Sequence, residues 1–238
     1  MTLWYELVGL LPFEWAQFKF MQHALLAVLI VAPLLAFLGC MVVNNQMAFF
    51  SDAMGHAGLT GIALGALVGL SDPLGAMLAF AVVLAIGITL LRRHGLASAD
   101  TVIGIVMSFA VALGIVILSR GGGFNKYSRF LIGDILSITA SEIGTLVLAA
   151  GAFIVIWTLL FNRLVLVSVN SSLARSRKAP VWITQSAFAI LTAVVVTVSI
   201  QWVGILVINA LIVLPAAAAR NPARSVFGYV WGSVAVGL

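Results

Sequence analysis

Long runs of apolar residues, separated by short polar segments, repeat along the whole chain. Complete runs occupy residues 24–43, 48–70, 73–91, 101–119, 142–161, 181–200 and 202–219, and an eighth begins near Val226. A helix needs about 20 apolar residues to cross a bilayer. The pattern therefore predicts an all-α, polytopic transmembrane helical bundle of about eight spans. Because the eighth run stops at Leu238, we expect either a truncated sequence or a last helix that lacks its far end.

Composition supports a membrane protein with one domain over residues 1–238. Of the 238 residues, 63% are hydrophobic and 8% are charged, whereas soluble domains contain about 25% charged residues. The net charge of +5 comes from basic residues scattered between the apolar runs, without a soluble domain to present them. This excludes a nucleic-acid surface and makes the lipid bilayer the expected environment.

The distribution of basic residues predicts the orientation, because short cytoplasmic loops are enriched in Lys and Arg. With the N-terminus outside, the inner segments hold eight basic residues and the outer segments hold four. Residues 1–23 are rich in aromatic side chains and are expected to form an interfacial segment. Residues 162–180 then form a long loop on the cytoplasmic side.

Asp52 and His56 are the most unusual residues within the apolar runs. Residues four apart lie on one face of a helix, and His56 is expected roughly 12 Å into a bilayer core about 30 Å thick. Ionisable groups at that depth usually mark an ion or substrate path. Carboxylate and imidazole suit zinc, manganese or iron. Two ligands form only a weak site, and Asp100, a second subunit or water could complete it.

A structural interpretation competes with this one. Ser51 or Asp52 could cap the helix, and His56 could be a buried, hydrogen-bonded core residue. Small residues also recur at every fourth position, at Ala53, Ala57, Gly61, Gly65 and Gly69. Such a stripe lets two helix backbones approach closely, so we expect the helix that carries the pair to pack tightly against a neighbour.

The sequence contains no motif for an energy source or for hydrolysis. A phosphate-binding loop needs GxxxxGK[ST] and a metalloprotease needs HExxH, and neither occurs. We therefore expect a transport subunit, not an enzyme, and no permanently bound cofactor. If ATP drives transport, a partner chain must hydrolyse it.

Three stretches together resemble the permease subunits of bacterial metal-ion ABC importers, the zinc, manganese and iron group. They read FFSDAMGHAGLTGIALG, DTVIGIVMSFAVALGIVILS and VGILVINALIVLPAAAAR. The resemblance implies a homodimer in the bacterial inner membrane. It also implies a cytoplasmic ATPase and an extracytoplasmic metal-binding protein as partners.

The resemblance also assigns roles to residues. Asp52 and His56 match the family's translocation-path motif, and Asp100 matches the acidic residue that opens the next motif. Gly204, Pro215, Ala216 and Arg220 match the last motif, in which the proline is expected to bend or interrupt the helix. The loop at residues 162–180 is expected to contain the coupling helix that contacts the ATPase, through Ser171, Ser172, Leu173, Ala174 and Arg175. Its sequence, SSLARSRKAP, is more basic than the family pattern and lacks a usual glycine.

The sequence thus favours an importer permease for a divalent transition metal, with zinc as the first candidate and manganese as the second. A stand-alone secondary transporter, in which Asp52 carries a proton in exchange for the ion, is the main alternative. A membrane scaffold without transport activity is the third.

Overall fold

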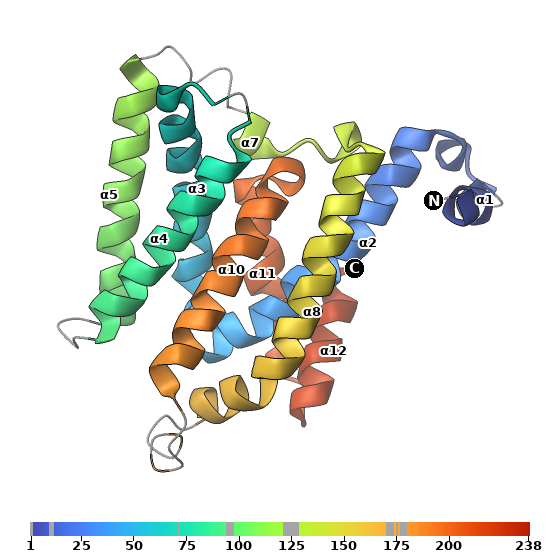
Figure 1. Cartoon of the computed structure of the whole chain (residues 1–238). Coiled ribbons are helices and arrows are strands. Elements are labelled where there is room, and N and C mark those ends of the chain that lie inside the picture. The colour runs from blue at the N-terminus through green and yellow to red at the C-terminus, as the bar shows by residue number, and fades with distance from the viewer. Residues whose placement is uncertain are drawn as a thin grey trace.

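The computed structural model describes residues 2–9, 12–70, 72–93, 98–120, 129–169, 174, 176 and 180–238. All regular secondary structure within these ranges is helical, which confirms the predicted all-α bundle (Figure 1). The elements, in chain order, are α1 (Thr2–Gly9), η1 (Glu14–Gln17), α2 (Lys19–Asn44), α3 (Ala48–Val68), α4 (Leu74–Arg93), α5 (Ala99–Arg120), α7 (Arg129–Ile132), η2 (Ile135–Ser137), α8 (Ala140–Val169), α10 (Val181–Val203), α11 (Ile205–Arg220) and α12 (Val226–Gly237).

Five of these helices, α2, α4, α5, α8 and α10, are long and apolar enough to cross a membrane. Helix α3 has 21 residues, which is sufficient length, but its first half contains Ser51, Asp52 and His56. Helices α11 and α12 are apolar and shorter, with 16 and 12 residues. The described residues therefore support a multi-pass membrane protein and do not confirm eight spans.

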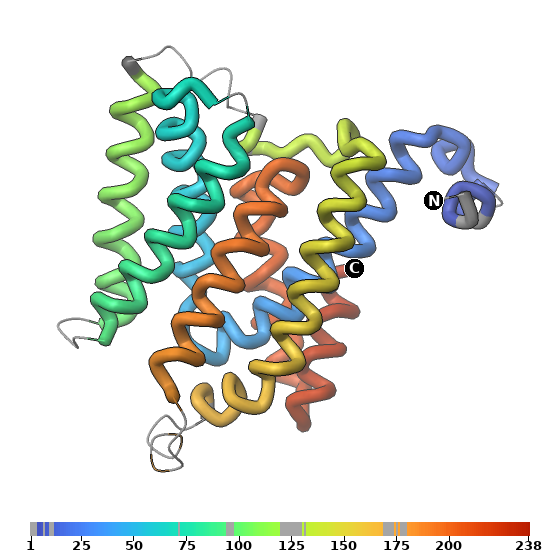
Figure 2. The backbone as a smooth tube through the Cα atoms, in the orientation of Figure 1, coloured from blue at the N-terminus to red at the C-terminus, as the bar shows by residue number. Residues whose placement is uncertain are grey.

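The long apolar helices differ in how much of their surface is buried inside the bundle. Among the five long apolar helices, α2 and α10 are the most buried, whereas α5 and α8 turn most of their surface outward, as lipid-facing helices do. Helix α3 packs most extensively against α4 and α5, and α11 packs against α2 and α12. The backbone trace shows α5 at one edge of the bundle and α1 at the opposite edge (Figure 2).

Glycines set the closest contacts between helices. A Cβ atom on Gly39 of α2 would overlap the carbonyl oxygen of Ile212 on α11. A Cβ on Gly61 of α3 would lie 2.6 Å from the Cα of Met77 on α4, and one on Gly65 would lie 3.0 Å from the Cβ of Ala76. The small-residue stripe therefore packs α3 against α4, as predicted. Its last member, Gly69, instead ends α3 in the left-handed conformation with φ +80°.

Helices α10 and α11 meet at a sharp break. Gly204 separates them with φ +80°, a conformation that glycine adopts at low cost. Gly133, with φ +83°, lies in the short segment between α7 and η2, and its backbone contacts the backbone of Gly204. The break thus occurs at Gly204. Helix α11 continues through Pro215 to Arg220, so the predicted interruption at the proline does not occur.

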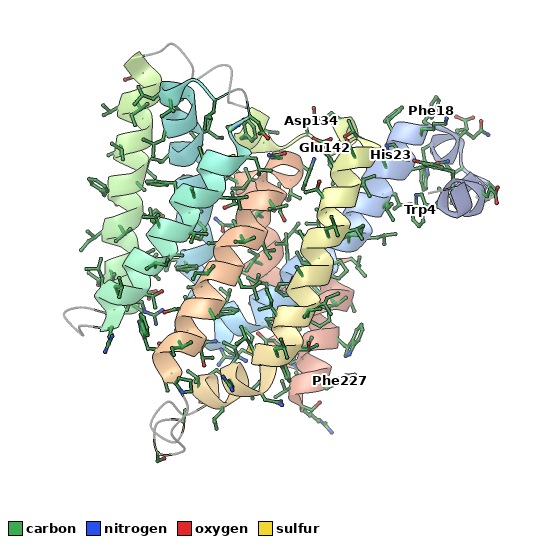
Figure 3. All side chains as sticks on the ribbon, in the orientation of Figure 1. Trp4, Phe18, His23, Asp134, Glu142 and Phe227 are labelled. Carbon is green, nitrogen blue, oxygen red and sulfur yellow. The ribbon has the colours of Figure 1, made fainter. Side chains whose placement is uncertain are left out.

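The N-terminal segment is attached to the start of α2 through side chains (Figure 3). Nε1 of Trp4 donates a hydrogen bond to the carbonyl oxygen of Gln22 at 3.1 Å. The hydroxyl of Tyr5 and Nε2 of His23 share another at 2.5 Å. Because α2 begins at Lys19, the last residues of the predicted interfacial segment belong to this long helix.

Candidate metal site

A tight turn places the start of α3 next to the end of α2. The carbonyl oxygen of Met41 accepts two hydrogen bonds from Asn45, from its backbone N–H at 2.9 Å and from its side-chain amide at 2.8 Å. Gln46 follows with φ +54°. The turn is short: α2 ends at Asn44 and α3 begins at Ala48.

The helix cap does not come from the side chains that the structural interpretation suggested. The N-cap residue of α3 is Met47, which makes no side-chain capping hydrogen bond. Ser51 lies inside the helix and donates to the carbonyl oxygen of Ala48 at 2.9 Å. Asp52 lies one residue further along, beyond the cap position. Neither Ser51 nor Asp52 therefore caps α3.

Asp52 and His56 lie side by side on one face of α3, as the spacing predicts. Nε2 of His56 is 3.6 Å from Oδ1 of Asp52, and the two side chains are 32% and 31% exposed. This distance exceeds the length of a good hydrogen bond. Neither ring nitrogen of His56 makes a hydrogen bond within the described ranges, and neither is buried without a partner. The imidazole is thus a partly open side chain and not a satisfied core residue.

A third polar side chain reaches the pair from another helix. The side-chain amide nitrogen of Asn209 on α11 donates a hydrogen bond to Oδ1 of Asp52. Near this bond, Gly55 of α3 approaches Ile205 of α11, where an added Cβ would lie 2.9 Å from Cγ2 of the isoleucine. The absence of a side chain at Gly55 lets α11 come close enough for Asn209 to reach Asp52.

Asn209 is the member of this group that the sequence interpretation missed. It lies in the third family-like stretch, VGILVINALIVLPAAAAR, and is the only amide side chain in α11. A lone amide in an apolar helix is a recognisable signal, because an unpaired polar group is costly in a bilayer. Periodicity does not reveal its partner, since that partner lies on a helix far away in sequence.

Asp100 does not join the pair. Among the described residues, no group of three or more His, Cys, Asp or Glu side chains could hold a metal ion. Asp100 lies in the first turn of α5 with its side chain exposed, and its carboxylate interacts electrostatically with Arg92 at the end of α4. A role for Asp100 in the ion path stays a prediction separate from the pair.

The residues predicted to contact the ATPase lie mostly outside the described ranges. Ser171, Ser172, Leu173 and Arg175 fall in this part of the chain. Ala174 is described, and it is fully buried. The coupling helix predicted between residues 162 and 180 therefore stays a prediction.

A second group of carboxylates lines an open cavity of about 480 Å³ at one end of the bundle. Asp72, Asp134 and Glu142 contribute to its wall, and the last two appear near each other in Figure 3. Two of these carboxylates have local partners: Asp72 accepts from the backbone nitrogen of Leu74 at 3.0 Å, and Glu142 accepts from that of Thr139 at 2.8 Å. They stabilise the starts of α4 and α8, so we do not count this cavity as a metal site.

Chemically, the α3 group combines one carboxylate, one imidazole and one amide. Carboxylate and amide oxygens are hard ligands, and imidazole is an intermediate one. Because the amide nitrogen of Asn209 faces Asp52, only the carboxylate and the imidazole are placed to bind an ion, and the group falls short of the four ligands of a stable zinc site. The arrangement suits brief contact with a divalent transition metal better than permanent binding.

Comparison with known proteins agrees with the resemblance noted in the sequence. The chain is 28% identical over 93% of its length to a manganese import system permease protein, ScaB, of Streptococcus parasanguinis, covering 79% of that protein. It is 30% identical over 87% of its length to a high-affinity zinc uptake system membrane protein, ZnuB, of Haemophilus influenzae, covering 80% of it.

A solved structure shows the same fold. The structure described as PsaBC from Streptococcus pneumoniae in complex with Fab superposes with a TM-score of 0.79 and 28% identity, over 93% of this chain and 79% of that one. Residues 17–238 match the family described as the ABC 3 transport family. The match covers nearly the whole chain and confirms the family predicted from the three sequence stretches. This protein belongs to the ABC 3 transport family.

Proposed function

We propose that this chain is the membrane permease subunit of an ABC importer that moves a divalent transition metal into the cytoplasm. The observation that carries the proposal is the pair formed by Asp52 and His56, 3.6 Å apart and each about a third exposed, in a chain of this transport family. Relatives named as manganese and zinc transport proteins support a metal as the transported ion. Zinc is the first candidate and manganese the second.

The weakness of the proposed site is consistent with transport. An ion must leave a conduction site as readily as it enters, so a site with few protein ligands favours passage. Asp52 would supply a carboxylate oxygen and His56 an imidazole nitrogen, and water or a second subunit would fill the other positions. A partly exposed carboxylate and imidazole within a membrane helix also need a polar or protein neighbour, which a second permease copy would supply.

Two further partners complete the proposed importer. An extracytoplasmic metal-binding protein would deliver the ion to the outer loops, and a cytoplasmic ATPase would contact the coupling segment at residues 162–180. The assembly would lie in the bacterial inner membrane. The lack of a nucleotide-binding motif in this chain agrees with a separate ATPase.

The test is metal uptake into vesicles that contain this chain with its ATPase and binding protein. Uptake of ⁶⁵Zn²⁺ and ⁵⁴Mn²⁺ is measured with and without ATP for the wild type, Asp52→Ala and His56→Ala. We expect ATP-dependent uptake of one metal that both substitutions reduce strongly while the amount of assembled complex stays constant. Uptake without ATP would support the secondary transporter. Normal uptake in both variants would remove the pair from the path.

A further inference from the structure

The side chain of Asn209 arranges the metal-binding atoms of the pair without being one of them. We propose that Asn209 is a positioning residue that fixes Oδ1 of Asp52 and leaves Oδ2 and His56 free for the transported ion. This inference rests on the proposed function and adds a residue from a second helix, α11, to the site.

The two carboxylate oxygens of Asp52 differ in their hydrogen bonds. Oδ1 accepts from the amide of Asn209 and lies 3.6 Å from Nε2 of His56. Oδ2 makes no hydrogen bond within the described ranges, and it is not one of the buried atoms without a partner. One carboxylate oxygen is therefore engaged and the other is open to solvent. The carboxylate oxygen that faces Nε2 of His56, at 3.6 Å, is Oδ1, and the imidazole nitrogens themselves make no hydrogen bond within the described ranges.

The carboxylate of Asp52 sets the orientation of the Asn209 amide. An ionised carboxylate only accepts hydrogen bonds, whereas a side-chain amide has one donor end and one acceptor end. The NH₂ group of Asn209 must therefore face Asp52, and its oxygen must point away. That oxygen, Oδ1 of Asn209, is buried and has no partner among the described residues. The fold tolerates a costly unpaired oxygen at the residue that holds Asp52.

Without Asn209, the carboxylate of Asp52 would be free to turn toward His56. A carboxylate and an imidazole four residues apart on one helix can turn toward each other and form a direct hydrogen bond. Such a bond would use both metal-binding groups at once. The hydrogen bond from Asn209 on α11 to Oδ1 fixes the orientation of the Asp52 carboxylate, and in that orientation Oδ1 lies 3.6 Å from Nε2 of His56, which is longer than a direct hydrogen bond. An ion entering the site then finds two groups that need not first be separated.

The experiment measures uptake of the transported metal at a series of metal concentrations in vesicles with the complete importer. The variants are Asn209→Leu, which keeps the branched shape with a somewhat larger volume and removes the donor, and Leu206→Ala as the matched control. Leu206 lies on the same helix and is 70% exposed. Asn209→Ala replaces Asn209→Leu if the latter fails to reach the membrane. Thermal unfolding of each purified chain in detergent reports on the fold.

We expect Asn209→Leu to raise the metal concentration for half-maximal uptake by about tenfold, as for the loss of one charge-assisted hydrogen bond. The maximal rate and the thermal stability should stay close to those of Leu206→Ala. A lower maximal rate or a lower stability with an unchanged half-maximal concentration would show a structural role and overturn the inference.

Asp52→Ala and His56→Ala, measured alongside, separate this inference from the function on which it rests. If these two substitutions impair uptake and Asn209→Leu does not, the pair is in the path and the positioning role is wrong. If none of the three impairs uptake, the metal site itself is wrong and the positioning role fails with it.

Discussion

Gly133 and Gly204 meet backbone to backbone, each with a positive φ, of +83° and +80°. A Cβ atom on Gly204 would overlap the carbonyl group of Ile132, and one on Gly133 would overlap the backbone of Val203. The contact joins the segment between α7 and η2 to the turn between α10 and α11. Asn209 lies little more than one helical turn beyond that turn, so the position of α11 depends on this contact.

Replacing Gly204 with alanine should lower the stability of the chain. The left-handed backbone conformation and the overlap with Ile132 both penalise a side chain, and we expect a loss of about 2 kcal/mol or more in the free energy of unfolding. Thermal unfolding in detergent measures this effect. The control is Gly144→Ala on α8, where nothing lies within 4 Å and alanine should raise helix stability by about 0.5–1 kcal/mol. Equal melting temperatures for the two variants would contradict the prediction.

Gly39→Ala should push α2 away from α11. Its added methyl group would enter the space of the Ile212 carbonyl, and overpacking of this kind typically costs about 1–3 kcal/mol. We expect lower yields of folded chain and a lower melting temperature. Gly87→Ala on α4, where an added Cβ finds open space, is the matched control. A Gly39→Ala chain as stable as the Gly87→Ala chain would show that the two helices can separate at no cost.

Thr60→Val tests a hydrogen bond between helices. Oγ1 of Thr60 on α3 donates to the carbonyl oxygen of Ala110 on α5 at 2.7 Å. Hydrogen bonds between membrane helices contribute about 0.6 kcal/mol on average, and we expect a loss of that order in an unfolding titration with a denaturing detergent. Thr158→Val is the control, because Thr158 bonds only within its own helix, to the carbonyl of Val155 at 2.8 Å. A smaller loss at Thr60 than at Thr158 would refute the prediction.

Asp100→Asn should affect uptake less than Asp52→Asn. Asp100 is exposed and interacts with Arg92, and it does not group with Asp52 and His56. We expect the metal concentration for half-maximal uptake to change by about twofold or less, as for an exposed charge whose interactions are screened by solvent. Vesicle uptake measures both variants side by side. Equal losses would instead place Asp100 at the same ion as Asp52.

Helix positions were predictable wherever the apolar runs were long and clearly bounded. The run predicted at 48–70 corresponds to α3 at Ala48–Val68, and that at 73–91 to α4 at Leu74–Arg93. Length and hydropathy are properties of a segment by itself, so sequence shows them. Of the two effects predicted for Pro215, α11 shows no interruption there, and a bend stays a prediction. The break at Gly204 depends on a contact with a distant segment.

The candidate site was predictable only within one helix. The spacing of Asp52 and His56 places them on a common face, and the structure shows them 3.6 Å apart. Asn209 could not be joined to them from the sequence, because periodicity does not say which helix faces which. That information arises from packing, here from the small surface of Gly55 against Ile205.

The close approach of helix backbones also limits how the chain can change shape. Helix α3 is held against α4 at Gly61 and against α5 at Thr60, and α2 is held against α11 at Gly39. Contacts of this kind resist sliding of one helix past another. The same kind of contact, between Gly55 and Ile205, holds α3 against α11 next to the hydrogen bond between Asn209 and Asp52. The geometry of the ion site is therefore tied to the backbone packing of α3 against α11, and a conformational cycle that separates these two helices would also take the site apart.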